Sequence, residues 1–228
     1  MNTAIIVAAG SGTRFNSEKP KQFVDLNGKP VLAHTLERFQ ACNDVDAVVV
    51  VLAEEHQPYF VELLNENPQI TKVSFVVLGG RTRAESVRNG LNGVDPATEV
   101  VLVHDGARPL VTVGEIERVI AKAKETGAAC LTAAVTDTIK QIDGDRIVGT
   151  VDRRELRRAL TPQGFKLEIL QKAFENADAL DEPVSDESYL VEQLGVKVAS
   201  VSGSSRNIKI THSEDLLIAE ALLKDGNS

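Results

Sequence analysis

Hydrophobic residues occur along the chain in short runs, and turn residues separate these runs. These runs are rich in β-branched residues and do not alternate strictly with polar positions. They occupy residues 4–7, 47–52, 73–78, 100–103, 128–135 and 196–201. Runs of this kind are typical of strands that are buried on both faces of a parallel sheet.

Between these runs, apolar residues recur at helical spacing. The clearest examples are Val31, Leu32, Leu36 and Phe39, and then Val113, Ile116, Val119 and Ile120. A last helix is predicted to begin at Thr211, with Glu214 completing a capping box. Because strands and helices alternate, the pattern predicts an α/β fold with a doubly wound, mostly parallel, Rossmann-like sheet.

One region interrupts this alternation. Residues 136–142 and 146–151 have strand-like composition, and Asp143-Gly144-Asp145 between them is a good hairpin turn. A hairpin inserted in an α/β domain has no evident place in the central sheet. We therefore expect a protruding β-arm, at about 136–159, that pairs with a second copy of the chain.

Length and charge narrow the function classes. The 228 residues suffice for a sizeable core, and we interpret 1–228 as a single domain. With 25 Lys and Arg against 33 Asp and Glu, the net charge is −8, and only 4% of residues are aromatic. Both values disfavour a nucleic-acid polymer as partner. The acidity is uneven, however, because 1–30 and 150–172 carry a basic excess.

The cysteines and the longest apolar run bear on the compartment. Cys42 and Cys130 lie far apart and have neither metal-ligand nor redox-pair spacing, which favours buried, reduced thiols. The apolar run at 47–53 is too short to cross a membrane, and the N-terminal run is too short for a signal peptide. We expect a soluble, cytoplasmic protein without a membrane partner.

The first candidate for chemistry is the small-residue loop 8–14, directly after the first predicted strand. Ligands of open α/β sheets bind at the carboxyl ends of strands, and small residues let backbone N–H groups approach a phosphate. Phe15 breaks the dinucleotide-binding pattern, and the P-loop pattern is absent. On spacing alone, an ordinary tight turn is an equal alternative. The nearby Arg14 and Lys21 favour a triphosphate, whereas Lys19 is interpreted as a surface charge.

The second candidate is Asp105, just beyond the strand predicted at 100–103. A carboxylate at this edge can hold Mg²⁺ beside phosphates, although a solvated Asp-Gly turn explains it equally well. His104 is interpreted as structural, because no nucleophile pairs with it. Three further segments, 79–86, 150–153 and 207–211, carry cations at loop or helix starts. The sequence has no assignable catalytic triad and no HExxH motif.

Six motifs occur in one order along the chain, and their order is more specific than any one of them. They lie at 8–14, 20–22, 103–109, 151–153, 160–163 and 207–209. Together they resemble the 2-C-methyl-D-erythritol 4-phosphate cytidylyltransferase family of the non-mevalonate isoprenoid pathway, over residues 3–223. The resemblance implies a nucleotidyltransferase domain that forms homodimers through its β-arm.

The resemblance also implies a reaction and a site. CTP and methylerythritol 4-phosphate would give the CDP-linked alcohol and pyrophosphate, with Mg²⁺ as the divalent cation. Arg14 and Lys21 match the family's transition-state stabilisers, Asp105 matches its magnesium ligand, and Arg153 and Lys209 match the pair that holds the acceptor phosphate. Matching nucleotide positions are Ala8, Ala9, Gly10, Ser11, Gly12, Gly80 and Ser86, together with Asp105. Matching substrate positions are Arg108, Asp137 and Thr138.

The sequence departs from the family pattern at two places. Arg81 stands where the family often has an acid, and Ser185 stands where Thr is often found. No general base is required, because the attacking phosphate is already ionised at neutral pH. Two alternatives stay open: a ribitol 5-phosphate cytidylyltransferase, and a non-catalytic nucleotide-binding module on the same fold.

Overall fold

A single mixed sheet organises the chain in the computed structural model, which describes residues 1–10, 15, 19–177 and 184–225. The strand order is β11-β7-β10-β6-β1-β4-β5. The bounds are β1 (Asn2–Ala8), β4 (Ala47–Leu52), β5 (Val73–Leu78), β6 (Val100–Asp105), β7 (Ala128–Ala134), β10 (Arg157–Lys166) and β11 (Ala199–Ser202). Only β10 runs antiparallel to its neighbours, so the predicted α/β class and mostly parallel sheet are confirmed.

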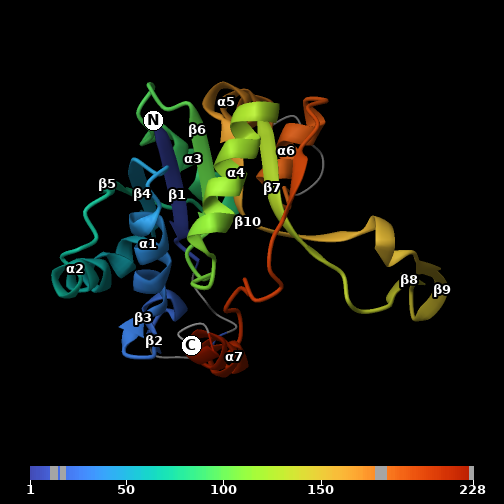
Figure 1. Cartoon of the computed structure of the whole chain (residues 1–228), viewed down its shortest axis with the longest axis horizontal. Helices are drawn as coiled ribbons and strands as arrows, with labels where there is room; N and C mark the ends of the chain where they lie inside the picture. The colour runs from blue at the N-terminus through green and yellow to red at the C-terminus, as the bar shows by residue number, and fades with distance from the viewer. Residues whose placement is uncertain (11–14, 16–18, 178–183, 226–228) are drawn as a thin grey trace.

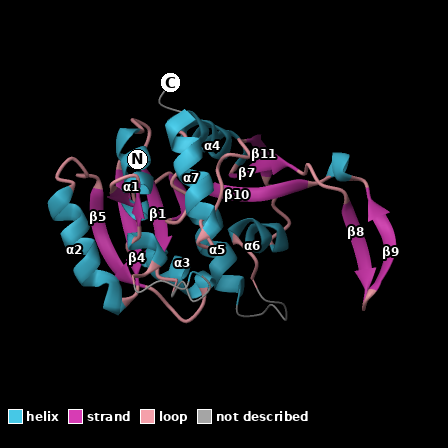
Figure 2. Ribbon diagram, turned by 90° about the horizontal axis from the view of Figure 1, so that it is seen from below, coloured by secondary structure: helices cyan, strands magenta, loops and turns pink. Residues whose placement is uncertain are grey.

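Helices cover both faces of this sheet (Figures 1 and 2). They are α1 (Val31–Ala41), α2 (Gln57–Glu66), α3 (Arg83–Asn92), α4 (Val113–Thr126), α5 (Leu167–Asn176) and α6 (Glu187–Gln193). The last helix, α7 (Glu214–Asp225), lies apart from the central sheet, and its Ala219 belongs to a separate apolar cluster with Leu26 and Val31 (Figure 1). One apolar cluster joins the sheet to α1, α2 and α4, and a second joins it to α3, α5 and α6. Ile6 of β1 belongs to the first cluster and Ile5 to the second, as alternation along a strand requires.

Strand β10 was not expected from the sequence. Its ladder with β7 is interrupted between Ala159 and Gln163, where Thr161 and Pro162 lie. Proline has no backbone N–H to donate to a neighbouring strand, so the sequence of this segment does not predict a central strand. Because β10 begins at Arg157, the last three residues of the expected 136–159 arm pair with β7 instead.

The predicted arm is a two-stranded antiparallel hairpin of β8 (Ile139–Asp143) and β9 (Arg146–Val151). It extends away from the central sheet (Figures 1 and 2). Gly144 in its turn has a φ of 57°, a conformation that glycine adopts without strain. Ile142, Ile147 and Val148 are exposed, so the hairpin carries apolar side chains that this chain does not cover.

The start of the last helix differs from the prediction. Helix α7 begins at Glu214, so Thr211 is not its N-cap. The Oδ2 atom of Asp215 accepts the backbone N–H groups of Thr211 and His212 at 2.7 and 2.8 Å. The predicted capping box is therefore wrong, because Asp215 rather than Glu214 receives the free amide groups.

The cysteines are free and buried, as expected. Among the residues that the structure describes, no helix combines the length and the hydrophobicity that a membrane span requires.

Candidate functional site

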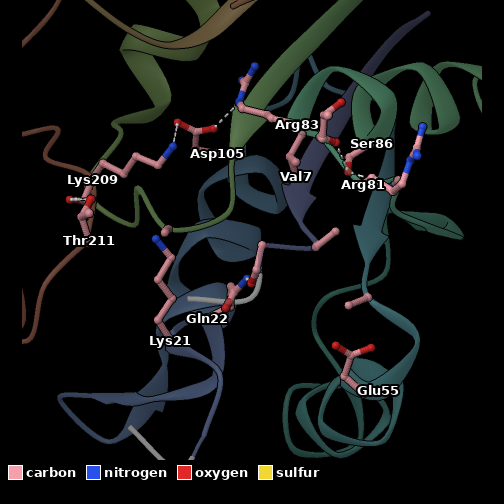
Figure 3. Close-up of a pocket in the computed structure, with 16 residues that line it drawn as sticks. Val7, Lys21, Gln22, Glu55, Arg81, Arg83, Ser86, Asp105, Lys209 and Thr211 are labelled. Atoms are coloured by element: carbon pink, nitrogen blue, oxygen red, sulfur yellow. Dashed lines mark hydrogen bonds and ion pairs between the residues drawn. The ribbon is translucent and has the colours of Figure 1, made fainter. Parts of the chain in front are cut away.

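A cleft of about 570 Å³ lies where four parallel strands end. Its lining comes from the ends of β1 and β6 and from the segments that follow β4 and β5 (Figure 3). Of the predicted site residues, the lining includes Ala9, Gly10, Lys21, Gly80, Ser86, Asp105 and Lys209. Residues far apart in sequence thus meet at the sheet edge where ligands of open α/β sheets bind.

The segment after β1 forms one wall. Ala8 is buried, and its carbonyl oxygen accepts a hydrogen bond from Nε2 of Gln22 at 2.7 Å. The same nitrogen donates to the carbonyl of Gly10 at 2.8 Å. The predicted nucleotide positions Ser11 and Gly12, and the predicted catalytic Arg14, lie outside the described residues. Gln22 belongs to the motif at 20–22, but the sequence indicated no function for its side chain.

Lys21 lies beside Gln22 in the short 3₁₀ helix η2 (Lys21–Phe23). Its ammonium group lines the cleft and donates to the carbonyl of Ile210 at 3.0 Å (Figure 3). This contact connects the N-terminal region with the segment before α7. The structure therefore brings the predicted Lys21 to the same cleft as Asp105 and Lys209.

Asp105 is the centre of a charged cluster. Its Oδ1 atom lies 3.1 Å from Nε of Arg83, and its Oδ2 atom lies 3.0 Å from Nζ of Lys209 and 3.3 Å from Nε of Arg108. Burial by itself raises the pKa of a carboxyl group, but the charges of Arg83, Lys209 and Arg108 outweigh burial and hold the pKa of Asp105 well below its usual range. The carboxylate stays ionised, and the three cations are held at fixed positions around it.

Arg83 is the cation whose role the sequence did not indicate. Its Nη1 atom donates to both carboxylate oxygens of Glu187, at 2.7 and 2.9 Å. Glu187 has no exposed surface, and burial raises its pKa despite the neighbouring Arg83. The pair joins α3 to α6 across 104 residues of sequence, which no local pattern could predict.

Arg108 is connected to Thr161 of β10 through Asn207. Nη1 of Arg108 donates to the carbonyl of Asn207 at 2.8 Å, and the buried Asn207 side chain donates to the carbonyl of Thr161 at 2.9 Å. The predicted substrate residue Arg108 therefore supports the cluster from beside the cleft.

His104 has the structural place that the sequence suggested. It is fully buried, with Nε2 at 3.1 Å from the carbonyl of Arg108 and Nδ1 at 3.1 Å from Oγ1 of Thr161. Burial lowers its pKa to about 3, so the ring is neutral at physiological pH.

The predicted nucleotide positions Gly80 and Ser86 meet at the start of α3. The backbone N–H of Gly80 donates to Oγ of Ser86 at 3.1 Å. A Cβ on Gly80 would lie 2.3 Å from Cβ of Glu85, so only glycine fits there. The unusual Arg81 donates its backbone N–H to Oε2 of Glu85 at 2.7 Å, and its side chain is 92% exposed at the cleft edge.

Three predicted residues lie elsewhere. Asp137 and Thr138 are exposed and immediately precede β8, and Arg153 begins the short helix η4 (Arg153–Glu155) after β9. Nη1 of Arg153 donates to the carbonyl of Thr136. Within one chain, the arm therefore does not bring these residues to the cleft, and their roles stay predictions.

Comparison with known proteins identifies the family. The family model of IspD, 2-C-methyl-D-erythritol 4-phosphate cytidylyltransferase, matches residues 2–225. The chain belongs to this family. The resemblance that the six motifs indicated is thereby confirmed.

Named IspD relatives match nearly the whole chain. The 2-C-methyl-D-erythritol 4-phosphate cytidylyltransferases of Syntrophus aciditrophicus and Bacillus mycoides are each 42% identical, over 97% and 98% of this chain and 95% and 98% of the relative. The 4-diphosphocytidyl-2C-methyl-D-erythritol synthase structure from Anaerococcus prevotii has a TM-score of 0.86 at 30% identity, over 98% of this chain and 96% of that one. The Thermus thermophilus cytidylyltransferase has a TM-score of 0.79 at 33% identity, over 96% and 98%.

Proposed function

We propose that the cleft transfers the cytidylyl group of CTP to 2-C-methyl-D-erythritol 4-phosphate. An acceptor phosphate oxygen attacks the α-phosphorus, the bond from that phosphorus to the bridging oxygen breaks, and pyrophosphate leaves. The products are 4-diphosphocytidyl-2-C-methyl-D-erythritol and pyrophosphate. The observation that carries this proposal is that Lys21 lines the same cleft as Arg83 and Lys209, which are paired with Asp105, in a member of the family.

The chain's part in the reaction is to position charge. Negative charge shifts onto the leaving pyrophosphate as the bond breaks, and fixed cations stabilise that charge without reorganisation. We assign this task to Lys21 together with Arg14. Since the attacking phosphate is already ionised, the neutral, buried His104 has no proton to remove.

The acceptor phosphate requires cations of its own. We assign Lys209 and Arg153 to hold it, and Arg108 to support them. Lys209 lies in the cleft, whereas Arg153 lies at the base of the arm, so a second copy would supply its Arg153 together with Asp137 and Thr138. The exposed apolar residues of the hairpin support a homodimer formed through the arm.

The cleft also fits a magnesium ion that arrives with the triphosphate. Mg²⁺ is commonly held by one or two carboxylates together with substrate phosphates. We assign Asp105, a carboxylate in the cleft lining, to hold the ion. The ion would neutralise phosphate charge.

The remaining assignments concern the cellular compartment and the partners of the protein. We place the protein in the cytoplasm, which the two free, buried cysteines support. The partners are small molecules rather than a nucleic-acid polymer, in agreement with the net charge of −8.

The test is pyrophosphate release from CTP with each of two acceptors. We expect turnover with 2-C-methyl-D-erythritol 4-phosphate. With ribitol 5-phosphate we expect turnover that is lower by about 10²-fold or more, because a site built for one set of hydroxyl groups rejects another. Turnover with ribitol 5-phosphate alone would assign the chain to the other acceptor. CTP binding without turnover on either acceptor would indicate a non-catalytic module.

A further inference from the structure

Gln22 is a buried side chain that no step of the proposed reaction uses. It is 2% exposed, although it contributes to the cleft lining. Its Nε2 group donates to the carbonyl oxygens of Ala8 and Gly10, at 2.7 and 2.8 Å. Carbonyl oxygens only accept hydrogen bonds, so the orientation of this amide is unambiguous.

The two carbonyl groups belong to the segment that forms the cleft wall, where free carbonyl oxygens would repel a bound anion. Ala9 and Gly10 line the cleft, and a carbonyl oxygen turned toward a triphosphate would repel its oxygens. While Gln22 holds these carbonyls, they face its amide instead of the bound anion. The planar trans peptide then directs the N–H of Ala9 the opposite way from the carbonyl of Ala8.

The segment that carries Gln22 is itself firmly attached. Phe23 is buried, with its ring centroid 5.9 Å from that of His56 and 5.5 Å from that of Tyr59. The N–H of Phe23 donates to the carbonyl of Pro20 at 2.8 Å. The amide of Gln22 is therefore presented to the loop from a rigid support.

The unpaired end of the side chain argues against a purely structural task. The Oε1 atom of Gln22 is buried and has no hydrogen-bond partner among the described residues. An unpaired buried acceptor lowers stability, and an apolar side chain of similar shape would avoid it. What glutamine adds over such a side chain is its pair of N–H donors to the loop.

We propose that Gln22 is a positioning residue that holds the backbone from Ala8 to Gly10 in the arrangement that binds the triphosphate of CTP. This inference rests on the proposed function, because it takes CTP as the ligand. Gln22 acts through the loop backbone and touches neither the reacting phosphorus nor the acceptor. Its removal weakens CTP binding and leaves the acceptor's KM unchanged.

Gln40 provides a matched control far from the cleft. Its Oε1 atom accepts the backbone N–H groups of Thr71 and Lys72, each at 2.9 Å. Gln22 and Gln40 each connect one side-chain amide to two backbone groups of a loop. Gln22 is buried, donates to carbonyls and lines the cleft, whereas Gln40 is partly exposed, accepts from N–H groups and lies outside the cleft lining. Gln40→Met therefore measures the effect on CTP binding of losing such a bridge away from the cleft.

The experiment measures CTP binding by calorimetry with Mg²⁺ present, beside thermal unfolding and steady-state kinetics. For Gln22→Met we expect a Kd for CTP that rises about 10- to 100-fold, from two lost hydrogen bonds. The acceptor's KM stays within about twofold, the melting curve shows that the variant is folded at the assay temperature, and Gln40→Met binds CTP normally.

A second variant adds a pH signature. In Gln22→Glu an ionised carboxylate would face two carbonyl oxygens, so CTP binding at neutral pH is weaker than in Gln22→Met. Burial and the carbonyls raise the pKa of the new carboxyl group, and its protonated form supplies one donor. The ratio of its CTP affinity to that of the wild type therefore recovers as pH falls.

The outcomes separate the two claims. Wild-type binding of CTP with unchanged affinity in both Gln22 variants overturns the inference alone. Normal CTP binding with no transfer to either acceptor overturns the proposed function alone. A wild type that does not bind CTP contradicts both.

Discussion

The cleft and the arm both carry charged residues, but the two regions hold them differently. In the cleft, Asp105 is 7% exposed and is paired with Arg83, Arg108 and Lys209. In the arm region, Arg154 is paired with Asp152, and these side chains are 87% and 46% exposed. Exposed pairs of this kind contribute about 0–1 kcal/mol to stability, so they fix little.

This difference in the order of charged side chains bears on the part of the proposed reaction to which each region is suited. Charges that are already oriented stabilise a transition state without the free-energy cost of reorganising them. The cleft has this property within one chain, whereas the arm does not. Under the proposed function, the cleft binds the triphosphate, and the arm residues would act against the cleft of a second copy.

The largest loss of turnover is expected for a substitution of Asp105, at the centre of the buried charged cluster. Asp105→Asn keeps the side-chain shape and removes the charge that three cations share, so we expect turnover to fall by about 10²–10³-fold. Pyrophosphate release measures the loss, and a thermal melt of the same sample checks that the protein is folded.

The matching control is Glu125→Gln, which neutralises an exposed carboxylate paired with Lys122 on α4. Its turnover should stay within about twofold of the wild type. Equal losses in the two variants would mean that the buried cluster has no special place in the reaction.

A smaller, more selective loss is expected at Lys21. Because the triphosphate gains charge in the transition state, Lys21→Ala should lower turnover by about 10²-fold and CTP affinity far less. Lys19→Ala, two residues earlier and outside the cleft lining, should change neither by more than about twofold. Similar losses in turnover and in affinity for Lys21→Ala would contradict a transition-state role.

The central strands were predictable because burial on both faces makes them continuously apolar. Strand β4 has the predicted bounds of 47–52 and is buried. Strand β5 also has its predicted bounds of 73–78, but it lies at the edge of the sheet and is mostly exposed, so the prediction that it is buried on both faces is wrong. The hairpin turn at 143–145 was evident from its residues. Strand β10 escaped detection because Pro162 and Gln163 interrupt its pattern, although tertiary pairing with β6 and β7 overrides local propensity.

The site was predictable where a residue follows a strand, and not where its partner is distant. Asp105 was singled out from its place after an apolar run, and Gly80 was assigned through the family resemblance. Arg83 was not assigned a task, because its partner Glu187 is 104 residues away. The sequence did not indicate the role proposed for Gln22, because that role depends on hydrogen bonds to the carbonyls of Ala8 and Gly10, which a sequence does not display.

The most direct test of the division between cleft and arm is complementation between two defective variants. Asp105→Asn damages the cleft, and Arg153→Ala damages the arm. When the two are co-expressed, a dimer of one of each has one site with an intact cleft and an intact arm. If half of the dimers are mixed, activity should recover to roughly a quarter of the wild-type value. Activity no higher than that of the two variants purified separately would contradict an arm that acts across the dimer.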